Sequence, residues 1–181
     1  MRMTRTIVVS EFVTLDGVME DPGGAEKDEN GFGGWAFRFD RGDAGDRFKL
    51  EELMAADSLL LGRRTYEGFA AAWPSMTDEQ GFAEKMNSMP KYVVSSTLAE
   101  PTWNATRIGL EDIEDLDGNL LVAGSQQLVQ TLFEHKLVDE VRLVLYPAAL
   151  GGGKKLFEVP ADFTLAGAEP SAQVVLLTYR S

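Results

Sequence analysis

Apolar runs of strand length recur along the chain, separated by stretches with helical periodicity. The runs are short, rich in β-branched and aliphatic residues, and bounded by Gly, Ser or Pro, as buried strands are. Two of them, close to the end, are separated only by AEPSAQ and can form a hairpin. The expected strands are residues 6–13, 58–62, 91–96, 119–124, 140–147, 163–167 and 174–180.

Amphipathic segments between these runs predict helices. SQQLVQTLFEHK (125–136) has an apolar stripe and Ser125 as its N-cap. Similar reasoning predicts helices over 46–57, over 65–73 with Thr65 as N-cap, and within 78–88. Strand and helix alternate in the middle of the chain, whereas the end is antiparallel. We therefore expect a single domain over 1–181, an α/β three-layer sandwich in which helices flank a mixed, mainly parallel sheet.

A long segment between the first strand and the first helix, from Asp16 to about Asp43, is rich in Gly, Asp and Glu. Three aromatic residues, Trp35, Phe37 and Phe39, interrupt it. Loops of this length in a compact domain are more often functional than idle. We expect this loop to border a site.

Charge and composition exclude several classes of function. The 181 residues include 29 acidic and 17 basic side chains, for a net charge of −12. This balance opposes binding to nucleic acid or to an anionic membrane, so any cationic pocket must be local. There is no cysteine and only one histidine, His135. Disulfides, zinc–thiolate sites and histidine-rich metal sites are therefore excluded, and we expect no metal.

The beginning of the chain, MRMTRTIVVSEFV, lacks the long apolar core of a signal peptide. No stretch approaches the roughly 20 apolar residues needed to cross a bilayer. We expect a cytoplasmic protein that does not bind membranes.

Three of the expected strands end in residues that suit phosphate. If these strands are parallel, their ends lie together at the carboxyl edge of the sheet, where open α/β folds bind ligands. Helix N-termini present free N–H groups there, and guanidinium groups match phosphate geometry. A ligand with more than one phosphate, such as NADPH, fits this pattern. The alternative is ordinary strand and helix punctuation with solubilising arginines. The three ends are Gly62-Arg63-Arg64-Thr65, Ser95-Ser96 and Gly124-Ser125-Gln126.

Four segments in a fixed order resemble the dihydrofolate-reductase-like proteins. They are FVTLDGV (12–18), LLLGRRTYEGF (59–69), KYVVSSTL (91–98) and residues 121–157. The likeness is strongest to the branch that contains the C-terminal reductase domain of the riboflavin-biosynthesis protein RibD. It implies a homodimer that binds NADPH across the carboxyl edge of the sheet.

The resemblance also assigns residues to parts of the cofactor. Gly62, Arg63, Arg64 and Thr65 would hold the adenosine side and the phosphates, and Ser95 and Ser96 the 2′-phosphate. Gly124, Ser125, Gln126 and Gln127 would form the loop over the pyrophosphate, and Asp16 and Gly17 the loop over the nicotinamide. The chain departs from dihydrofolate reductases in two places, with Ala123-Gly124 for their Gly-Gly pair and Leu128 for a tyrosine.

Two acidic residues are candidates for catalysis. Dihydrofolate reductases carry a carboxylate on the helix before this glycine–arginine segment, and Asp46 holds a comparable place; its alternative role is as a helix N-cap. Asp16 follows the first strand and could face the nicotinamide, or simply form a turn. Trp35, Phe37 and Tyr66, with Trp73, could form a stacking wall for a flat heterocycle, or belong to the core.

The resulting prediction is an NADPH-dependent reductase that transfers hydride to a C=N bond or masked carbonyl of a pyrimidine- or pteridine-like small molecule. The RibD branch implies 5-amino-6-(5-phosphoribosylamino)uracil as the substrate, although the acidity of the chain counts against a phosphorylated one. Dihydrofolate is the enzymatic alternative. A non-catalytic nucleotide-binding dimer with this fold is the other.

Overall fold

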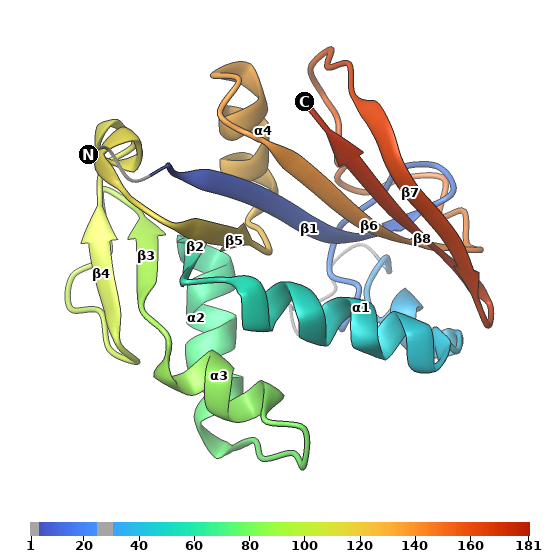
Figure 1. Ribbon diagram of the computed structural model, residues 1–181, viewed down its shortest axis with the longest axis horizontal. Helices are drawn as coiled ribbons and strands as arrows, with labels where there is room; N and C mark the ends of the chain where they lie inside the picture. The colour runs from blue at the N-terminus through green and yellow to red at the C-terminus, as the bar shows by residue number, and fades with distance from the viewer. Residues whose placement is uncertain (1–3, 25–30) are drawn as a thin grey trace.

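One continuous sheet runs through the molecule and carries helices on both faces (Figure 1). The computed structural model describes residues 4–24 and 31–181. Within these residues the sheet has eight strands in the order β4-β3-β2-β5-β1-β6-β8-β7. The strands are β1 (Thr6–Thr14), β2 (Ser58–Gly62), β3 (Lys91–Val94), β4 (Ala105–Ile108), β5 (Asn119–Val122), β6 (Glu140–Tyr146), β7 (Thr164–Ser171) and β8 (Val174–Arg180).

Strands from β4 across to β6 run parallel, and β8 and β7 complete the sheet as antiparallel strands. The predicted mixed, mainly parallel sheet is confirmed. β1 pairs with β6 as far as Thr14, whereas its pairing with β5 stops at Val9 and Val122. The sheet therefore opens between β1 and β5 toward its carboxyl edge.

Helices cover the two faces unequally. On one face α4 packs into a core that includes Val9, Leu60 and Val129, and the other three helices cover the opposite face. This arrangement is the three-layer sandwich expected from the sequence. The helices of the described residues are α1 (Gly42–Ala55), α2 (Arg63–Ala72), α3 (Phe82–Ser88) and α4 (Gln126–Glu134).

The central strand β2 shows why the apolar runs are continuous rather than alternating. Leu59 and Leu61 enter the core beneath α1 to α3, whereas Leu60 enters the core beneath α4. All its residues are buried, because helices cover both faces of a parallel sheet.

Two of the predicted helix starts are wrong and one is confirmed. Ser125 caps α4, its Oγ accepting a hydrogen bond from the Leu128 N–H at 3.4 Å. Thr65 does not cap α2, because Gly62 leaves β2 in extended conformation and helical geometry begins at Arg63. Similarly, α1 begins at Gly42, so Asp46 lies inside this helix and is not its N-cap.

The edges of the sheet also differ from expectation. β4 was not predicted, because Ala105–Ile108 is short and only partly buried. β7 is longer than predicted and includes Pro170, which an edge strand tolerates. The six residues 25–30 of the predicted long loop lie outside the described part of the chain.

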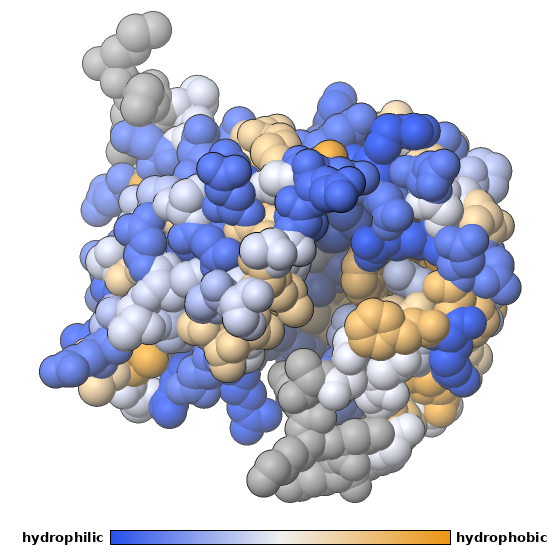
Figure 2. Space-filling view, turned by 90° about the horizontal axis from the view of Figure 1, so that it is seen from below, coloured by the Kyte–Doolittle hydropathy of each residue, from blue (hydrophilic) through white to orange (hydrophobic). Residues whose placement is uncertain are grey.

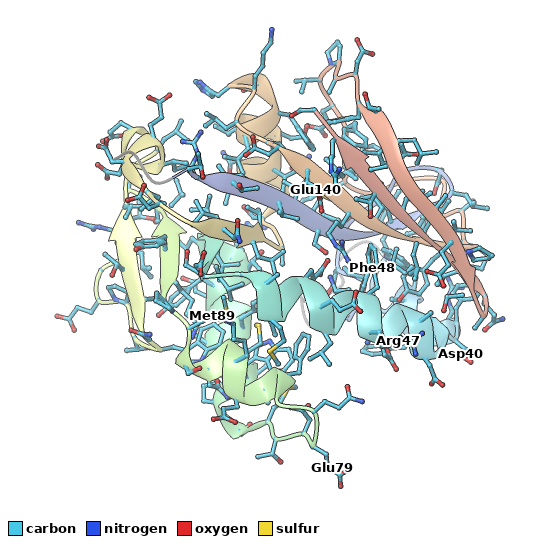
Figure 3. The ribbon with its side chains drawn as sticks, in the orientation of Figure 1. Asp40, Arg47, Phe48, Glu79, Met89 and Glu140 are labelled. Atoms are coloured by element: carbon cyan, nitrogen blue, oxygen red, sulfur yellow. The ribbon has the colours of Figure 1, made fainter. Side chains whose placement is uncertain are left out.

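Charged side chains spread over the outside of the molecule. Figure 3 shows Asp40 beside the start of α1 and Glu79 on the loop before α3, both at the periphery. In residues 4–24 and 31–181, no helix has the length and apolarity needed to cross a membrane.

Candidate functional site

The starts of α2 and α4 meet at the carboxyl edge of the sheet. The Gly62 N–H donates a hydrogen bond to the Gly124 carbonyl at 3.1 Å, which holds the two strand ends together. A Cβ atom on Gly62 would lie 2.1 Å from the Ser125 Oγ, and one on Gly124 would lie 2.7 Å from the Thr65 Oγ1. Only glycine fits at either position. The structure thus brings together two of the three strand ends that the sequence singled out.

The turn between β5 and α4 has an unusual backbone. Gly124 has a φ of +110°, which favours glycine, and the peptide bond between Gly124 and Ser125 is cis. In the sequence these glycines stood out only as parts of strand ends that suit phosphate. The structure gives the reason for glycine, the close approach of each to the other helix.

The first turns of α2 and α4 start at this junction, which places their backbone N–H groups next to it. Neither helix has an acidic residue in its first turn, and α2 begins with Arg63 and Arg64. Free N–H groups, the positive ends of two helix dipoles and two guanidinium groups concentrate positive potential at one place in an acidic chain. Such a junction can bind more than one phosphate group.

Arg63 connects this junction to the third strand end. Its Nη1 donates to the Thr97 Oγ1 at 2.7 Å, and its Nε pairs with Glu67 at 2.7 Å. Ser95 organises the same loop, because its Oγ accepts hydrogen bonds from the N–H groups of Thr97 and Leu98 at 3.1 and 3.0 Å. Half of the Arg63 side chain is exposed, so it remains available to a ligand. The neighbouring Arg64 and Ser96 are also exposed.

Gln126 and Gln127 have different environments at the start of α4. Gln126 donates from its side chain to the Lys155 carbonyl at 3.2 Å, whereas Gln127 is exposed. Gln130, which was not predicted, is buried one turn later; it donates to the Leu156 carbonyl and accepts from the Glu158 N–H at 3.0 Å. Gln126 and Gln130 therefore fix the segment that follows Gly153 against α4.

Asp16 holds a turn after β1. Its carboxylate accepts hydrogen bonds from the Thr14 hydroxyl at 2.6 Å and from the Gly151 N–H at 2.8 Å, and it also accepts from the Leu150 N–H. The Thr14 hydroxyl, followed by these backbone donors, lowers the pKa of Asp16 to about 2. Asp16 is thus ionised at neutral pH and has no proton to donate. Gly17, which has a φ of +80°, follows it and accepts from the Leu156 N–H through its carbonyl at 2.8 Å.

Asp46 lies on the solvent side of α1. Its carboxylate pairs with Arg41 at 2.6 Å, and 56% of its side chain is exposed. The structure does not bring Asp46 to Asp16 or to the junction of α2 and α4 by any contact among the described residues.

The four aromatic residues of the predicted stacking wall do not meet at one place, because only Tyr66 and Trp73 share a core. Trp35 is buried against Tyr146, with 5.4 Å between ring centroids. Tyr66 is buried in a different core, where its hydroxyl donates to the Thr102 carbonyl at 3.1 Å. Phe37 is 82% exposed. Trp35 and Tyr66 therefore act as core residues, the alternative that their aromatic character had left open.

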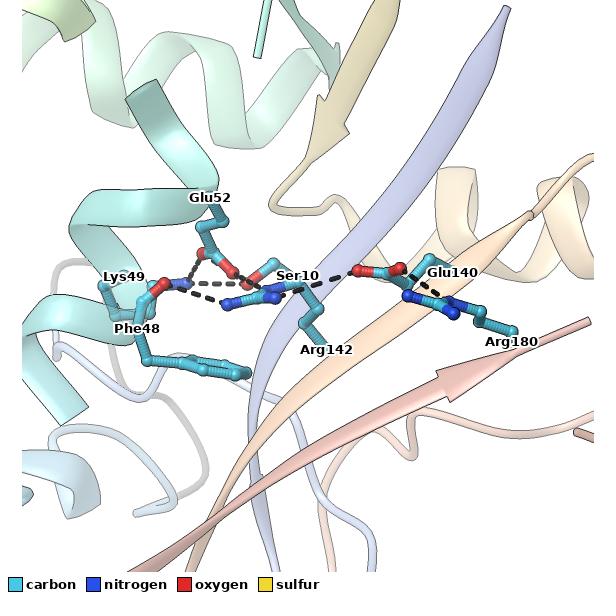
Figure 4. Close-up of polar contacts among 7 residues, drawn as sticks. All are labelled: Ser10, Phe48, Lys49, Glu52, Glu140, Arg142 and Arg180. Carbon is cyan, nitrogen blue, oxygen red and sulfur yellow. Dashed lines mark hydrogen bonds and ion pairs between the residues drawn. The ribbon is translucent and has the colours of Figure 1, made fainter. Parts of the chain in front are cut away.

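A buried ionic network joins α1 to β1 and β6 (Figure 4). Glu52 is at its centre: it accepts from the Ser10 hydroxyl at 2.6 Å and pairs with Lys49 and with Arg142, the latter at 3.0 Å. The Arg142 guanidinium also stacks over the Phe48 ring at 3.7 Å. The sequence did not predict this network, because Glu52 and Arg142 lie 90 residues apart.

Two cations gather over one half-buried aromatic ring. Arg41 and Lys49 lie 5.6 and 5.1 Å from the ring centroid of Phe12, on the carboxyl half of β1. From the sequence, few cations seemed to remain outside the cofactor site. The fold assembles this pair from positions that are not adjacent in the chain.

Hollows occur at more than one place on the surface. A groove of about 340 Å³ lies between α1 and the amino ends of the strands, with Thr6, Asn119 and Glu140 in its lining. It is therefore at the opposite edge of the sheet from Gly62 and Gly124. Viewed from below the orientation of Figure 1, the molecule has a further hollow near its middle with apolar borders (Figure 2). It separates the half that carries β2 to β4 from the half that carries β7 and β8.

Comparison with known proteins identifies the family. The family model of the RibD C-terminal domain matches residues 5–108 and 110–177. The chain belongs to the RibD C-terminal domain family. Two relatives come from Bacillus subtilis (strain 168), the uncharacterised proteins YyaP and YwjB. YyaP is 31% identical over 163 residues, which cover 84% of this chain and 80% of YyaP. YwjB is 24% identical over 180 residues, which cover 98% of both chains.

Solved structures confirm the fold. A putative riboflavin biosynthesis protein from Shewanella sp. PV-4 superposes with a TM-score of 0.73 at 22% identity, over 97% of this chain and 98% of that one. RibD from Acinetobacter baumannii gives 0.65 at 13% identity, over 97% of this chain and 57% of that one. Dihydrofolate reductase from Enterococcus faecalis, complexed with NADP(H) and RAB-propyl, gives 0.55 at 10% identity, over 97% and 95%. This member of the RibD C-terminal domain family thus has the dihydrofolate-reductase-like fold expected from its motifs.

Proposed function

We propose that this chain is an NADPH-dependent reductase that transfers hydride to a pyrimidine- or pteridine-like small molecule. The observation that carries the proposal is the junction of α2 and α4, where Gly62 and Gly124 meet and Arg63 reaches the loop of Ser95. Membership of a reductase family supports it, as does the complex of the structurally similar dihydrofolate reductase with NADP(H).

The residues at the junction fit the phosphates of NADPH by their chemistry. The first-turn N–H groups of α2 and α4 would hold the pyrophosphate, together with Thr65, Ser125, Gln126 and Gln127. Arg63, with Arg64, Ser95 and Ser96, would hold the 2′-phosphate, because guanidinium and hydroxyl groups are its usual donors. Gly17 would border the nicotinamide. When bound, the cofactor supplies the hydride.

The substrate side of the proposal rests on the family and on the recess with apolar borders in Figure 2. A flat heterocycle suits such a recess. The cations over Phe12 allow the substrate to carry an anionic group, which weakens the argument from net charge against the phosphoribosylaminouracil. We further propose that the protein acts in the cytoplasm and as a homodimer.

Cofactor titration tests this proposal. Tryptophan fluorescence from Trp35, Trp73 and Trp103 should change on addition of NADPH, and more weakly on addition of NADH. Arg63→Ala should raise the Kd for NADPH about tenfold or more, because a charge-assisted hydrogen bond contributes about 1.5–3 kcal/mol. The Kd for NADH should change little.

Arg47→Ala is the matched control for this titration. Arg47 is an exposed arginine of α1, so its loss changes the net charge equally without touching the junction. If wild-type protein binds neither cofactor, the proposed function is wrong. Equal losses for NADPH and NADH in Arg63→Ala would mean that Arg63 does not read the 2′-phosphate.

Two alternatives use the same fold. Dihydrofolate is the alternative substrate, with its C=N bond in the heterocycle itself, and turnover with each candidate separates the two. A non-catalytic nucleotide-binding dimer gains support from Asp46, whose carboxylate is exposed and paired with Arg41. Tight NADPH binding without reduction of either heterocycle would favour that alternative.

A further inference from the structure

The carboxyl half of β1 contains a buried acid, Glu11. Only 8% of this residue is exposed, and among the described residues its Oε1 finds no hydrogen-bond donor. A buried polar atom without a partner destabilises a fold, so such atoms are few in native proteins and each requires an explanation. The sequence offered one signal, a glutamate inside the apolar run TIVVSEFV.

Glu11 stands where the sheet opens. The β1–β5 ladder stops at Val9 and Val122, and its continuation would place Glu11 opposite Gly124. It does not continue, and the Gly124 carbonyl accepts from the Gly62 N–H of β2. By register and chain order, Glu11 therefore stands on β1 beside the Gly124 end of β5 and ahead of the turn at Gly17.

The surroundings of Glu11 favour its neutral form. Burial raises its pKa to about 8, against a smaller lowering by Lys49 and a small further rise from Glu52, both on α1. The neighbour on β6 is Leu143, and strand alternation places Glu11 on the face of α4, which contributes apolar side chains to that core. At neutral pH Glu11 is therefore mostly a carboxylic acid.

The other acids near the carboxyl half of β1 have cationic or hydrogen-bond-donating partners. Asp16 has a pKa of about 2, and Glu52 pairs with Lys49 and Arg142. Asp46 pairs with Arg41 at the surface. Reduction of a C=N or C=O bond consumes one proton for each hydride, and the raised pKa of Glu11 lets this acid hold one at neutral pH.

We propose that Glu11 is the proton donor of the reduction, a role that rests on the proposed function. Hydride arrives with its electron pair at the carbon of the C=N or C=O bond, and the π pair of that bond moves to the heteroatom. The heteroatom takes the proton from the Glu11 carboxyl, and the carboxylate left behind regains a proton from water. The dihydronicotinamide is oxidised and the C=N or C=O bond is reduced, so electrons and protons balance.

Infrared spectroscopy of the full chain tests where this proton resides. A protonated carboxyl group absorbs at a different infrared frequency from a carboxylate. Wild-type protein at neutral pH should therefore show a carboxyl band that Glu11→Gln lacks. The band should fade as the pH rises through about 8. Addition of NADP⁺, alone and with dihydrofolate, should shift it, because a ligand at the opening between β1 and β5 would contact this carboxyl.

Single-turnover kinetics tests the role itself. NADPH oxidation is followed with 7,8-dihydrofolate and with 5-amino-6-(5-phosphoribosylamino)uracil as probes. Glu11→Gln keeps the size of the side chain but cannot donate a proton, so hydride transfer should slow about a hundredfold or more. The Kd for NADPH should change far less than the rate of hydride transfer. The wild-type rate should fall above pH about 8, and the variant should lose this dependence. Glu51→Gln, on the exposed side of α1, is the matched control.

The outcomes separate this inference from the proposed function. No NADPH binding by wild-type protein overturns both. Binding with a band that does not shift overturns the inference alone and makes Glu11 a structural acid satisfied by water. Equal rates of hydride transfer in Glu11→Gln and wild type also overturn it. If NADPH binds and neither probe is reduced, the infrared band decides whether the inference stands. A band that shifts on addition of NADP⁺ supports a role for Glu11 at the site, and one that does not shift overturns it.

Discussion

Asp16 illustrates how a single carboxylate can serve structure where the sequence suggested catalysis. Its partners are the Thr14 hydroxyl and the N–H groups of Leu150 and Gly151, which belong to a segment far along the chain. Hydrogen bonds to the charged form lower the pKa of a carboxyl. Asp16 therefore links the end of β1 to the glycine-rich segment 151–153, and we expect its loss to loosen that link.

Asp16→Asn should lower stability in a pH-dependent way. The pKa of Asp16 is about 2 in the folded protein and ordinarily 3.8, so the unfolded chain binds its proton more readily. The stabilisation is therefore present above pH 3.8 and is lost as the pH falls toward about 2. Urea unfolding of wild type and variant should show a difference at neutral pH that closes over this range.

Asp162→Asn is the control for Asp16, since Asp162 is exposed before β7. It should leave the unfolding midpoint unchanged at every pH. A constant difference between Asp16→Asn and wild type down to pH 2 would show that the charge of Asp16 is not what stabilises the turn.

The contact between the starts of α2 and α4 determines how closely the two helices approach. Gly62→Ala would place a Cβ 2.8 Å from the backbone nitrogen of Ser125, a contact that requires the two helix starts to separate. Overpacking of this kind costs about 1–3 kcal/mol. The urea midpoint should fall accordingly, and NADPH binding should weaken because the first-turn N–H groups move apart.

Gly68→Ala provides a control within the same helix. Gly68 lies in the middle of α2, and a Cβ there meets nothing within 4 Å. This variant should gain up to about 1 kcal/mol from helix propensity and bind NADPH as wild type does. If both variants behave alike, the close approach of Gly62 to Ser125 is not important for either property.

The elements were predictable where the local signal was strong. β2 and α4 follow from a continuous apolar run and from a capped amphipathic stripe. The start of α1 was missed because the segment around Gly42 and Gly45 has low helix propensity, so the sequence favoured a later start. The missed start also affected Asp46, which the sequence placed at the beginning of the helix as a catalytic candidate. A small change in the position of a helix decides which of its side chains face outward.

The junction proposed to hold phosphate was also within reach of the sequence, because Gly62 and Gly124 each follow a buried strand and precede a helix. Contacts between positions far apart in the chain could not be predicted from the sequence. Glu52 with Arg142, and Arg41 with Phe12, form only when the sheet brings separate segments together. Aromatic residues such as Trp35 and Tyr66 suit a core as well as a binding wall, so sequence alone left both possibilities open.

The two edges of the whole sheet are protected to different degrees. β4 is short and carries the exposed Arg107, and short or charged edge strands resist pairing with another chain. β7 at the opposite edge has eight residues, of which most are exposed, and Leu165 is 56% exposed. In a chain with a net charge of −12, this weakly charged edge opposes self-association less than a strongly charged surface would.

We therefore expect the proposed homodimer to use the edge formed by β7. Sedimentation velocity should show a dimer for wild-type protein, and Leu165→Lys should shift it to monomer, because a charge on an edge strand disfavours pairing. Met54→Lys, which alters an exposed residue of α1, should remain dimeric. Wild-type protein that sediments only as monomer would remove the dimer from the proposal. A Leu165→Lys variant that stays dimeric would place the interface on another face of the molecule.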